Sequence, residues 1–433
     1  MKYFVFQKLQ NNQYRLYDVS TDTIKVIEHA EYLKISVPNY YQIKNGMFDE
    51  PTEDHLRKYG KVFEQWRLEL LSEKIDIFQE KELYLLVANL FFKYCKIKIK
   101  DLEPITFTEY KWYQKLNLAS AMYFDETIQD TPMDTYSYDY KSFYPKSMSS
   151  PKFLIPNCEG VETKINKLPD PKKLKCGIYN VSISSDNKDF KKVFSFSKSN
   201  HYTNTSIKYA FDMQSKFDVK IELNMDCEFN ALIYEETISG DKLFGSHFEA
   251  LNAIKTKYPK NKLVKFLLSS LSGHLARTNY KFITSNEIMN YDVSSKVETD
   301  SEYLVIDHTV SFSGSKTIDY FKILNKKRPY RYNIRLYPWL ISFTRNKTYS
   351  LAQESLEDCI RIQTDSVAFK KPMIFNKAFF GPNVLAPEEK STGLIKWSNI
   401  NKYYKKCQLC NEWIVVSKMQ LHQITECLTI TEN

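Results

Sequence analysis

No stretch of this sequence is long and apolar enough to suggest a membrane span or a secretory signal. Its most apolar run, residues 83–92, contains Asn89 and is too short to cross the hydrocarbon core of a bilayer. The first residues also lack the extended apolar segment of a signal peptide. These absences predict a soluble intracellular protein that is neither secreted nor inserted into a membrane.

The cysteine pattern of a small secreted protein is also missing. Three of the eight cysteines lie near the C-terminus together with His422, in the spacing Cys-x2-Cys-x11-His-x4-Cys. This spacing predicts a closed, structural Zn²⁺ site formed by Cys407, Cys410, His422 and Cys427. Unligated thiols in a packed tail are the alternative. The other five are scattered, as expected of reduced thiols inside a cell: Cys95, Cys158, Cys176, Cys227 and Cys359.

Glycine is scarce, with 10 among 433 residues, whereas Lys, Asn, Ile and Tyr are abundant. This bias is typical of an AT-rich coding sequence and suggests a viral or mobile element. The hydrophobic content of 43% is enough for a real core and argues against wholesale disorder, and the length suggests about three domains. A net charge of +9, with 31 Tyr and 28 Phe available for stacking, suits a polyanionic partner without proving one.

Residues 136–145 carry the first candidate site. The alternation of Tyr136, Tyr138 and Tyr140 predicts a strand with its aromatic rings on one face. Asp139 lies where this strand ends, and Pro145, which has no N–H to donate, is expected to stop the ladder. A carboxylate at a strand end beside a tight turn can hold a metal ion and a phosphate together. An ordinary turn aspartate is the alternative.

Three stretches, taken together, resemble the polymerase motifs of family B DNA polymerases, in the order that this family uses. Asp139-x-x-Ser142-Phe143-Tyr144-Pro145 resembles the motif Asp-x-x-Ser-Leu-Tyr-Pro. Residues 265–273 resemble Lys-x-x-x-Asn-Ser-x-Tyr-Gly, and Gln363-Thr364-Asp365-Ser366 resembles Asp-Thr-Asp-Ser. Residues 359–369 are predicted to form a β-hairpin that presents Asp365 at its tip. The resemblance covers roughly the last three quarters of the chain.

The resemblance implies an α+β fold with right-hand polymerase architecture: a palm with an antiparallel sheet, helical fingers and a small thumb. The expected division is an N-terminal α+β region at 1–110, palm at 111–245 and 281–372, fingers at 246–280, thumb at 373–404 and a zinc-knuckle-like tail at 405–433. The pattern of apolar residues predicts amphipathic helices over residues 53–73 and 338–356.

The resemblance also implies the roles of individual residues. Asp139 and Asp365 would be catalytic and would hold two Mg²⁺ or Mn²⁺ ions, with the Tyr140 carbonyl as a further ligand. The incoming nucleotide would be bound by Tyr140, Ser142, Phe143, Tyr144, Lys255, Lys265, Ser269 and Gly273. Thr364, Lys396, Lys402 and Tyr404 would contact DNA. Tyr144 would lie under the sugar and exclude a 2′-hydroxyl.

Further stretches point to the protein-primed branch of that family. Residues 234–244 resemble the end of the insertion with which this branch grips its priming protein. The expected partners are therefore template and primer DNA, deoxynucleoside triphosphates and a terminal protein, in the host cytoplasm or nucleus if the protein is viral.

A proofreading exonuclease is not expected. Glu103 follows Asp101 in the Asp-x-Glu spacing of that domain, after an alternating stretch at residues 96–100 that predicts a strand. The first polymerase motif comes too soon afterwards to leave room for an exonuclease fold. A surface acidic pair after a lysine-rich edge strand is the preferred interpretation.

Three departures from the family pattern keep a second function open. Gln363 stands where the family has an aspartate, Ser269 where it has an asparagine and Ser272 where it has a tyrosine. Loss of that aspartate would lower the negative charge beside the metal ions, and with it metal affinity and rate. The alternative function is a catalytically inactive, polymerase-derived DNA-binding replication protein. A plain zinc-knuckle nucleic-acid binder would leave the three ordered motifs unexplained.

Overall fold

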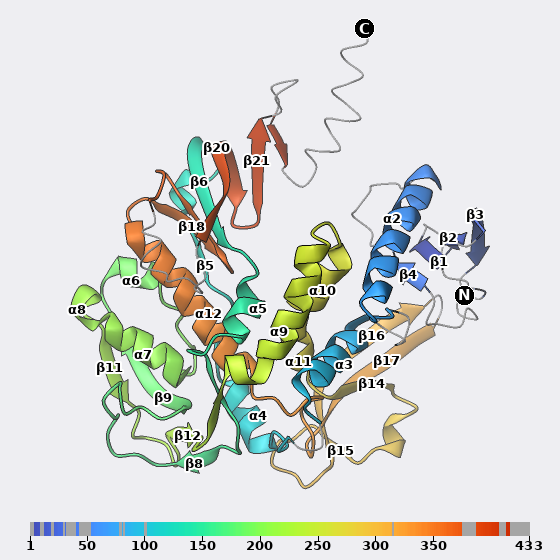
Figure 1. Ribbon diagram of the computed structural model, residues 1–433. Coiled ribbons are helices and arrows are strands. Elements are labelled where there is room, and N and C mark those ends of the chain that lie inside the picture. The colour runs from blue at the N-terminus through green and yellow to red at the C-terminus, as the bar shows by residue number, and fades with distance from the viewer. Residues whose placement is uncertain are drawn as a thin grey trace. The chain divides into compact units, whose positions relative to one another are not determined.

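The computed structural model of the chain describes residues 4–8, 13–18, 21–28, 31, 40–42, 53–77, 80, 83–98, 102–313, 316–374, 387–406 and 413–415. Helices and strands both occur throughout this part of the chain (Figure 1), so the predicted α+β class is confirmed. None of the helices in these ranges is both long and apolar enough to cross a membrane. The chain divides into two compact units, residues 1–98 with 244–274 and residues 99–243 with 275–433.

The first unit combines a four-stranded sheet with helices. The sheet has the order β3-β2-β1-β4. Gly60 lies in the middle of α2, and a Cβ at that position would fall on the ring of Tyr17, which explains a glycine in a helix interior. The predicted helix at 53–73 is confirmed as α2. The elements are β1 (Phe4–Lys8), β2 (Gln13–Asp18), β3 (Thr23–Glu28), β4 (Tyr40–Gln42), α2 (Glu53–Ser72), α3 (Leu83–Cys95), most of α9 (Gly240–Lys257), α10 (Lys262–Ser269) and α11 (Leu271–Leu275).

One strand prediction in this unit is wrong. Residues 96–98 do not form a strand, because Lys96 has a φ of 55°, in the left-handed region, and ends α3 instead. The alternation of Lys and Ile was misleading because so short a pattern also occurs in the irregular residues that follow a helix. Asp101 lies outside the described residues.

The second unit contains a seven-stranded sheet of order β22-β21-β20-β6-β19-β18-β5. Its strands come from widely separated parts of the chain, and β6 pairs antiparallel with both β19 and β20. The expected thumb segment includes β20, which continues this sheet; a separate thumb stays a prediction. The strands are β5 (Met122–Phe124), β6 (Pro132–Tyr140), β18 (Cys359–Gln363), β19 (Ser366–Phe369), β20 (Pro387–Asn399), β21 (Lys402–Lys406) and β22 (Trp413–Val415).

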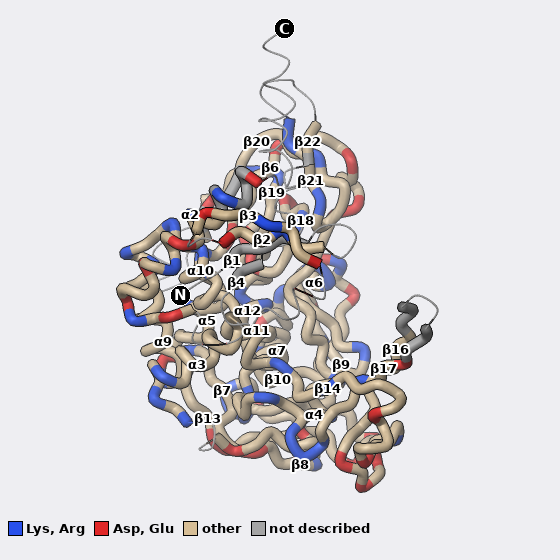
Figure 2. Tube along the Cα trace, turned by 90° about the vertical axis from the view of Figure 1, so that its right-hand side faces the viewer, with Lys and Arg blue, Asp and Glu red and all other residues tan. Residues whose placement is uncertain are grey.

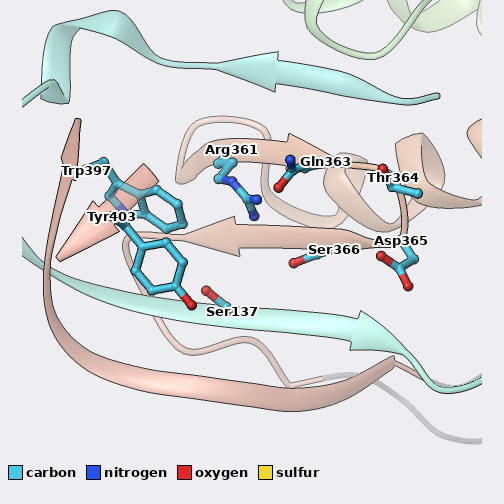
Figure 3. Close-up of a pocket in the computed structure, with 8 residues that line it drawn as sticks. All are labelled: Ser137, Arg361, Gln363, Thr364, Asp365, Ser366, Trp397 and Tyr403. Atoms are coloured by element: carbon cyan, nitrogen blue, oxygen red, sulfur yellow. The ribbon is translucent and has the colours of Figure 1, made fainter. Parts of the chain in front are cut away.

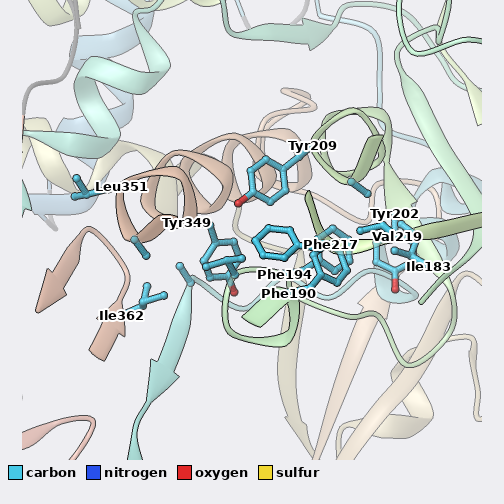
Figure 4. Close-up of a cluster of buried hydrophobic side chains, with 14 of the residues drawn as sticks. Ile183, Phe190, Phe194, Tyr202, Tyr209, Phe217, Val219, Tyr349, Leu351 and Ile362 are labelled. Atoms are coloured by element: carbon cyan, nitrogen blue, oxygen red, sulfur yellow. The ribbon is translucent and has the colours of Figure 1, made fainter. Parts of the chain in front are cut away.

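A helix-covered apolar core supports one face of this sheet. Helix α12 (Tyr337–Ala352) packs against β18, β19, α5 (Phe143–Met148) and α7 (Asn204–Asp212). Aromatic rings from these elements fill the space between them, and Tyr349 of α12 stacks on Tyr209 of α7 with ring centroids 6.5 Å apart (Figure 4). The predicted helix at 338–356 therefore exists but is shorter, because residues 353–355 tighten into a 3₁₀ turn.

Smaller sheets complete the second unit. Strands β10, β9, β12 and β8 form one sheet, with β11 also paired to β9. Strands β14, β17, β16 and β15 form another, in which β16 and β17 make a long hairpin. Their elements, with the remaining short ones, are α4 (Phe107–Gln114), β7 (Leu154–Pro156), β8 (Val161–Thr163), β9 (Gly177–Ser184), α6 (Lys188–Lys192), β10 (His201–Thr203), α8 (Gln214–Phe217), β11 (Lys220–Leu223), β12 (Ala231–Ile233), β13 (Thr237–Ser239), β14 (Tyr280–Thr284), β15 (Val293–Ser294), β16 (Tyr303–Ser313) and β17 (Lys316–Asn325).

Candidate active site

Asp139 and Asp365 lie on neighbouring strands of the seven-stranded sheet, although the chain separates them widely. Asp139 of β6 is directly opposite Ser366 of β19, and Asp365 is the residue before Ser366. The Tyr140 N–H donates to the Asp365 carbonyl oxygen across 3.1 Å, so the pairing extends to the hairpin tip. The structure therefore brings the two predicted catalytic carboxylates to neighbouring ends of two paired strands, β6 and β19.

Alternation along β6 separates the core from the site. Tyr138 and Tyr140 are buried in the core on the α12 side, and Tyr136 packs against the same core. Successive side chains of a strand point to opposite faces, so Asp139 lies on the other face, together with Ser137. The prediction that the three tyrosines share one face is confirmed.

The hairpin that presents Asp365 is confirmed, and its tip is held by hydrogen bonds. Thr364 has a φ of 54°, which is uncommon for a β-branched residue and costs about 1–3 kcal/mol. Its N–H donates to the Ala121 carbonyl oxygen at 2.8 Å, and its own carbonyl accepts from the Thr348 hydroxyl at 2.8 Å. Its hydroxyl donates to Ser120 at 3.3 Å. These contacts fix the turn beside Asp365.

The turn after Asp139 differs in one respect from the prediction. Strand β6 ends at Tyr140, and Pro145 lies inside the first turn of α5 rather than at the end of the ladder. A proline is tolerated there because the first N–H groups of a helix have no partner within it. Ser142, just before α5, has a φ of 54° and a ψ of 44°, which turns the chain sharply after the candidate metal site.

Tyr144 is half-buried in the first turn of α5. Burial raises the pKa of the Tyr144 phenol, a hydrogen bond with Thr344 opposes this rise, and the charges of Tyr337 and Asp365 add to it. The ring of Phe143 meets that of Tyr144 edge-on at 5.6 Å and stacks on Tyr140 at 4.9 Å. The ring of the predicted sugar-contacting residue is therefore packed against the aromatic residues that follow Asp139.

Gln363 makes a specific contact of its own. Its side-chain amide donates to the Asn401 side-chain oxygen in the turn between β20 and β21. Two residues earlier, the Arg361 Nε–H donates to the Ile400 carbonyl oxygen at 2.7 Å. These two contacts attach the β20–β21 turn to β18. The glutamine that stands in place of the family's aspartate therefore takes part in a contact within the sheet.

Sequence reasoning did not single out Arg361. The residue as a whole is 8% exposed, and its guanidinium stacks over the Trp397 ring at 4.8 Å. Burial lowers its pKa to about 10, while the charges of Tyr403 and Asp365 oppose the fall, so it stays cationic at neutral pH. The available signal was the Arg361-Ile362-Gln363 alternation, which places Arg361 and Gln363 on one face of β18.

The predicted DNA-contacting lysines gather at one side of the same sheet. Lys396 of β20 is paired with Tyr404 of β21, and the Lys396 and Lys402 ammonium groups lie 5.1 and 5.3 Å from the Tyr404 ring centroid. Further basic residues follow along β21, whose sequence is KYYKK (Figure 2). In the register of β20 with β6, Lys396 lies opposite Pro132 and Glu388 lies opposite Asp139, so Lys396 is at the other end of β6 from the Asp139 carboxylate.

The predicted nucleotide-binding residues of the second motif lie in the first unit. Leu263, Val264, Leu267 and Leu268 are buried along α10, which leaves Lys265 and Ser269 exposed on its other side. Gly273 of α11 is exposed and has open space around it, and Lys255 is half-buried on α9. Asp139 belongs to the second unit, and the relation of these residues to it stays a prediction.

The predicted zinc ligands Cys407, Cys410, His422 and Cys427 lie outside the described residues. Within the described ranges, no group of three or more His, Cys, Asp or Glu side chains is arranged to hold a metal ion. The donor set that the structure offers for a catalytic metal is therefore the Asp139 and Asp365 carboxylates with neighbouring backbone carbonyls. These are all oxygen atoms, which suits Mg²⁺ or Mn²⁺.

Comparisons of the sequence with protein-family models and with curated proteins find no match. Comparison with solved structures does. A Phi29 DNA polymerase complexed with primer-template DNA superposes with a TM-score of 0.62 at 10% identity, covering 95% of this chain and 89% of that one. The ternary complex of Phi29 DNA polymerase with primer-template DNA and incoming nucleotide gives 0.59 at 12% identity, again covering 95% and 89%.

A third structure, Phi29 DNA polymerase complexed with single-stranded DNA, gives a TM-score of 0.57 at 14% identity and covers 88% of this chain and 65% of that one. At such identities the likeness concerns the fold. Together with the paired strands that carry Asp139 and Asp365, it shows that this chain is similar in fold to Phi29 DNA polymerase.

Proposed function

We propose that this protein is a DNA-directed DNA polymerase that extends a primer by metal-dependent nucleotidyl transfer. The observation that carries the proposal is the placement of Asp139 and Asp365 on adjacent strands of one sheet. Three motif-like stretches in family order and a fold similar to that of a DNA polymerase support it.

The Asp139 and Asp365 carboxylates would hold the metal ions, with the Tyr140 carbonyl as a further oxygen donor. When bound, Mg²⁺ or Mn²⁺ would supply Lewis acidity for the attacking 3′-hydroxyl and for the leaving diphosphate. The tight hydrogen bonding around Thr364 keeps Asp365 in place before any ligand binds, which is the preorganisation that such a site needs.

Other residues would bind and orient the substrates. The backbone N–H groups of Ser142 and Phe143 would face the phosphates, and the Tyr144 ring would lie under the sugar and exclude a 2′-hydroxyl. Lys265 and Lys255 would neutralise the charge of the triphosphate. Thr364 would contact DNA at the hairpin tip, and the basic β20–β21 pair, with Lys396, Lys402 and Tyr404, would hold the primer strand by its phosphates.

Finer points of the proposal depend on the sequence resemblance. They are priming by a terminal protein, the lack of proofreading, a viral or mobile-element origin, and an arrangement of palm, fingers and thumb. The C-terminal Zn²⁺ site is a separate proposal. Metal analysis of the purified protein before and after a Cys407→Ser, Cys410→Ser double substitution tests it, and absence of stoichiometric zinc in the unaltered protein would exclude it.

The second candidate function is a catalytically inactive DNA-binding replication protein, favoured by Gln363, which stands where the family has an aspartate and donates its side-chain amide to Asn401. Primer extension on a primed template with Mg²⁺ or Mn²⁺ separates the two. Extension that is abolished by Asp139→Ala supports the polymerase. Tight binding of the same DNA with no extension under either metal supports the inactive protein.

A further inference from the structure

A small cavity lies on the Asp139 face of the sheet, beside the hairpin tip. Its volume is about 170 Å³, and residues of β6, β18, β19, β20 and β21 line it (Figure 3). Pockets for drug-sized molecules are larger, about 300–1,000 Å³. The cavity therefore suits a single small polar group rather than a whole nucleoside.

A buried cation faces this cavity. Figure 3 shows the Arg361 side chain extending from β18 toward Ser366 of β19. The guanidinium is anchored by its Nε–H to the Ile400 carbonyl oxygen at 2.7 Å and by the Trp397 ring at 4.8 Å. Among the described residues Arg361 forms no ion pair, and its side-chain hydrogen bond is the one that Nε–H donates to Ile400. A buried charge normally has a partner, so this arrangement calls for an explanation.

Three hydroxyl groups share the cavity with this cation. Ser137 is 5% exposed and Ser366 6% exposed, and Tyr403 directs its hydroxyl toward Ser137 (Figure 3). None of the three hydroxyls has a hydrogen-bond partner among the described residues. Among the described residues that line the cavity, Asp365 at the rim is the one with an acidic side chain. The cavity is therefore rich in donors and holds a fixed positive charge.

We propose that this cavity is a binding site for one phosphate-type oxyanion, held by the Arg361 guanidinium with the hydroxyls of Ser137, Ser366 and Tyr403. The planar fork of an arginine matches two oxygens of a phosphate. The choice of phosphate rests on the proposed function, because the cavity adjoins Asp365, where phosphates of the substrates would gather. The source is either a phosphodiester of the primer strand or free diphosphate.

The Asp365 carboxylate would repel an anion unless a metal ion or distance offsets its charge. Arg361 already opposes this charge, as their mutual electrostatic interaction shows. The arrangement also accounts for the anchoring contacts of Arg361, because a guanidinium held by Trp397 and Ile400 loses little further entropy when it binds an anion. Arg361 would thus be a binding residue beside the reacting centre.

The test measures binding to the full-length protein without any extension reaction. Diphosphate binding is followed by calorimetry in the absence of divalent metal. Primer-template binding is followed by fluorescence anisotropy, with normal linkages or with neutral methylphosphonate linkages at the primer end. The variants are Arg361→Met, Arg361→Lys and, as a control for net charge, Arg328→Met, which removes an exposed arginine outside the cavity.

We expect Arg361→Met to weaken the binding of one of the two ligands by about tenfold or more. Arg361→Lys should weaken the binding of that ligand less. Arg328→Met should change diphosphate binding by less than about twofold. Loss confined to diphosphate identifies the free ion as the ligand. Loss confined to DNA, and absent with methylphosphonate linkages, identifies the primer strand. Unchanged binding of both ligands, or equal losses in the Arg361 and Arg328 variants, would overturn the proposal in favour of a water-filled cavity.

Arg361→Met can also fail to fold, so a second variant keeps the test decisive. Ser137→Ala combined with Ser366→Ala removes two cavity hydroxyls and leaves the guanidinium contacts intact. We expect the same ligand to bind about tenfold or more weakly, since the loss of even one hydrogen bond to a charged group corresponds to roughly that factor. No loss in this variant contradicts the proposal. Because no step requires primer extension, an inactive protein that still shows these losses would disprove the proposed function alone.

Discussion

The backbone N–H of Tyr140 donates to the carbonyl oxygen of Asp365 across 3.1 Å. This hydrogen bond joins the end of β6 to the tip of the β18–β19 hairpin. It also makes the residue after Asp139 the direct neighbour of Asp365, so the two carboxylates cannot separate without breaking the ladder.

Removing either carboxylate should abolish primer extension. Asp139→Asn and Asp365→Asn each keep the size of the side chain but remove one of two charges that would hold the metal ions, so we expect extension rates to fall by about 10³-fold or more. Single-nucleotide incorporation with Mg²⁺ measures this. Asp134→Asn, an exposed position on the same strand, is the matched control. Near-normal extension by Asp139→Asn would contradict the assigned site.

Restoring an acidic residue at position 363 should strengthen metal binding. Gln363 lies on β18 two residues before Asp365, and a third carboxylate near the metal ions would add a few kcal/mol at most at an effective dielectric constant of about 20. We therefore expect Gln363→Asp to lower the Mg²⁺ concentration for half-maximal extension by about three- to tenfold. Gln363→Glu is the control for chain length. A higher Mg²⁺ requirement in Gln363→Asp would indicate that the contact with Asn401 matters more than the charge.

Tyr144 should control the choice of sugar. Its ring is half-buried in the first turn of α5, shortly after Asp139, so truncation would open space where a 2′-hydroxyl could fit. We expect Tyr144→Ala to raise ribonucleotide incorporation relative to deoxynucleotide by about 10- to 100-fold. Tyr144→Phe keeps the ring and should keep the discrimination. Ratios of kcat/KM for matched nucleotides provide the measurement, and equal ratios in the alanine variant and the unaltered protein would refute a sugar-contacting role.

The Thr348 hydroxyl should matter for rate. It donates to the Thr364 carbonyl at 2.8 Å and so supports the left-handed turn beside Asp365. Thr348→Val keeps the shape and removes this bond, which should cost about 1 kcal/mol in the free energy of unfolding and lower kcat by about three- to tenfold with little change in KM. Ser350→Ala, which removes an exposed hydroxyl from the same helix, is the control. A loss expressed only in KM would assign Thr348 to substrate binding instead.

His247 should make the first unit sensitive to mild acid. It is 3% exposed next to Phe91, and burial lowers its pKa from 6.5 to about 4. The unfolded chain therefore takes up a proton between about pH 6.5 and 4 that the folded state excludes, so stability falls as the pH falls through this window. The difference corresponds to about 3 kcal/mol at the low end.

Urea denaturation between pH 7 and pH 4, compared for the unaltered protein and His247→Leu, measures this contribution. The leucine variant should lose less stability on acidification. His308→Gln, at a half-exposed position of the β16–β17 hairpin, should leave the profile unchanged. Parallel profiles for the unaltered and His247→Leu proteins would show that folding does not lower the pKa of His247.

The local features of the site were predictable from sequence. Period-two alternation placed the tyrosines of β6 on one face and Asp139 on the other, and turn residues between two apolar strands predicted the Asp365 hairpin. Both signals are local, because strand pleating and turn conformation depend on neighbouring residues. Where local patterns were ambiguous they misled. This holds for residues 96–98 after α3 and for Pro145, which lies in the first turn of a helix rather than at the end of a strand.

By itself, then, the sequence determined which residues are chemically suited to the site and in what order they occur. Only the tertiary structure decided that β20 pairs with β6, that Thr348 and Ala121 hold the turn at Thr364, and that Arg361 is buried against Trp397 with its cation facing a cavity. The physical reason is that strand pairing and burial depend on contacts between distant segments, which no local periodicity records.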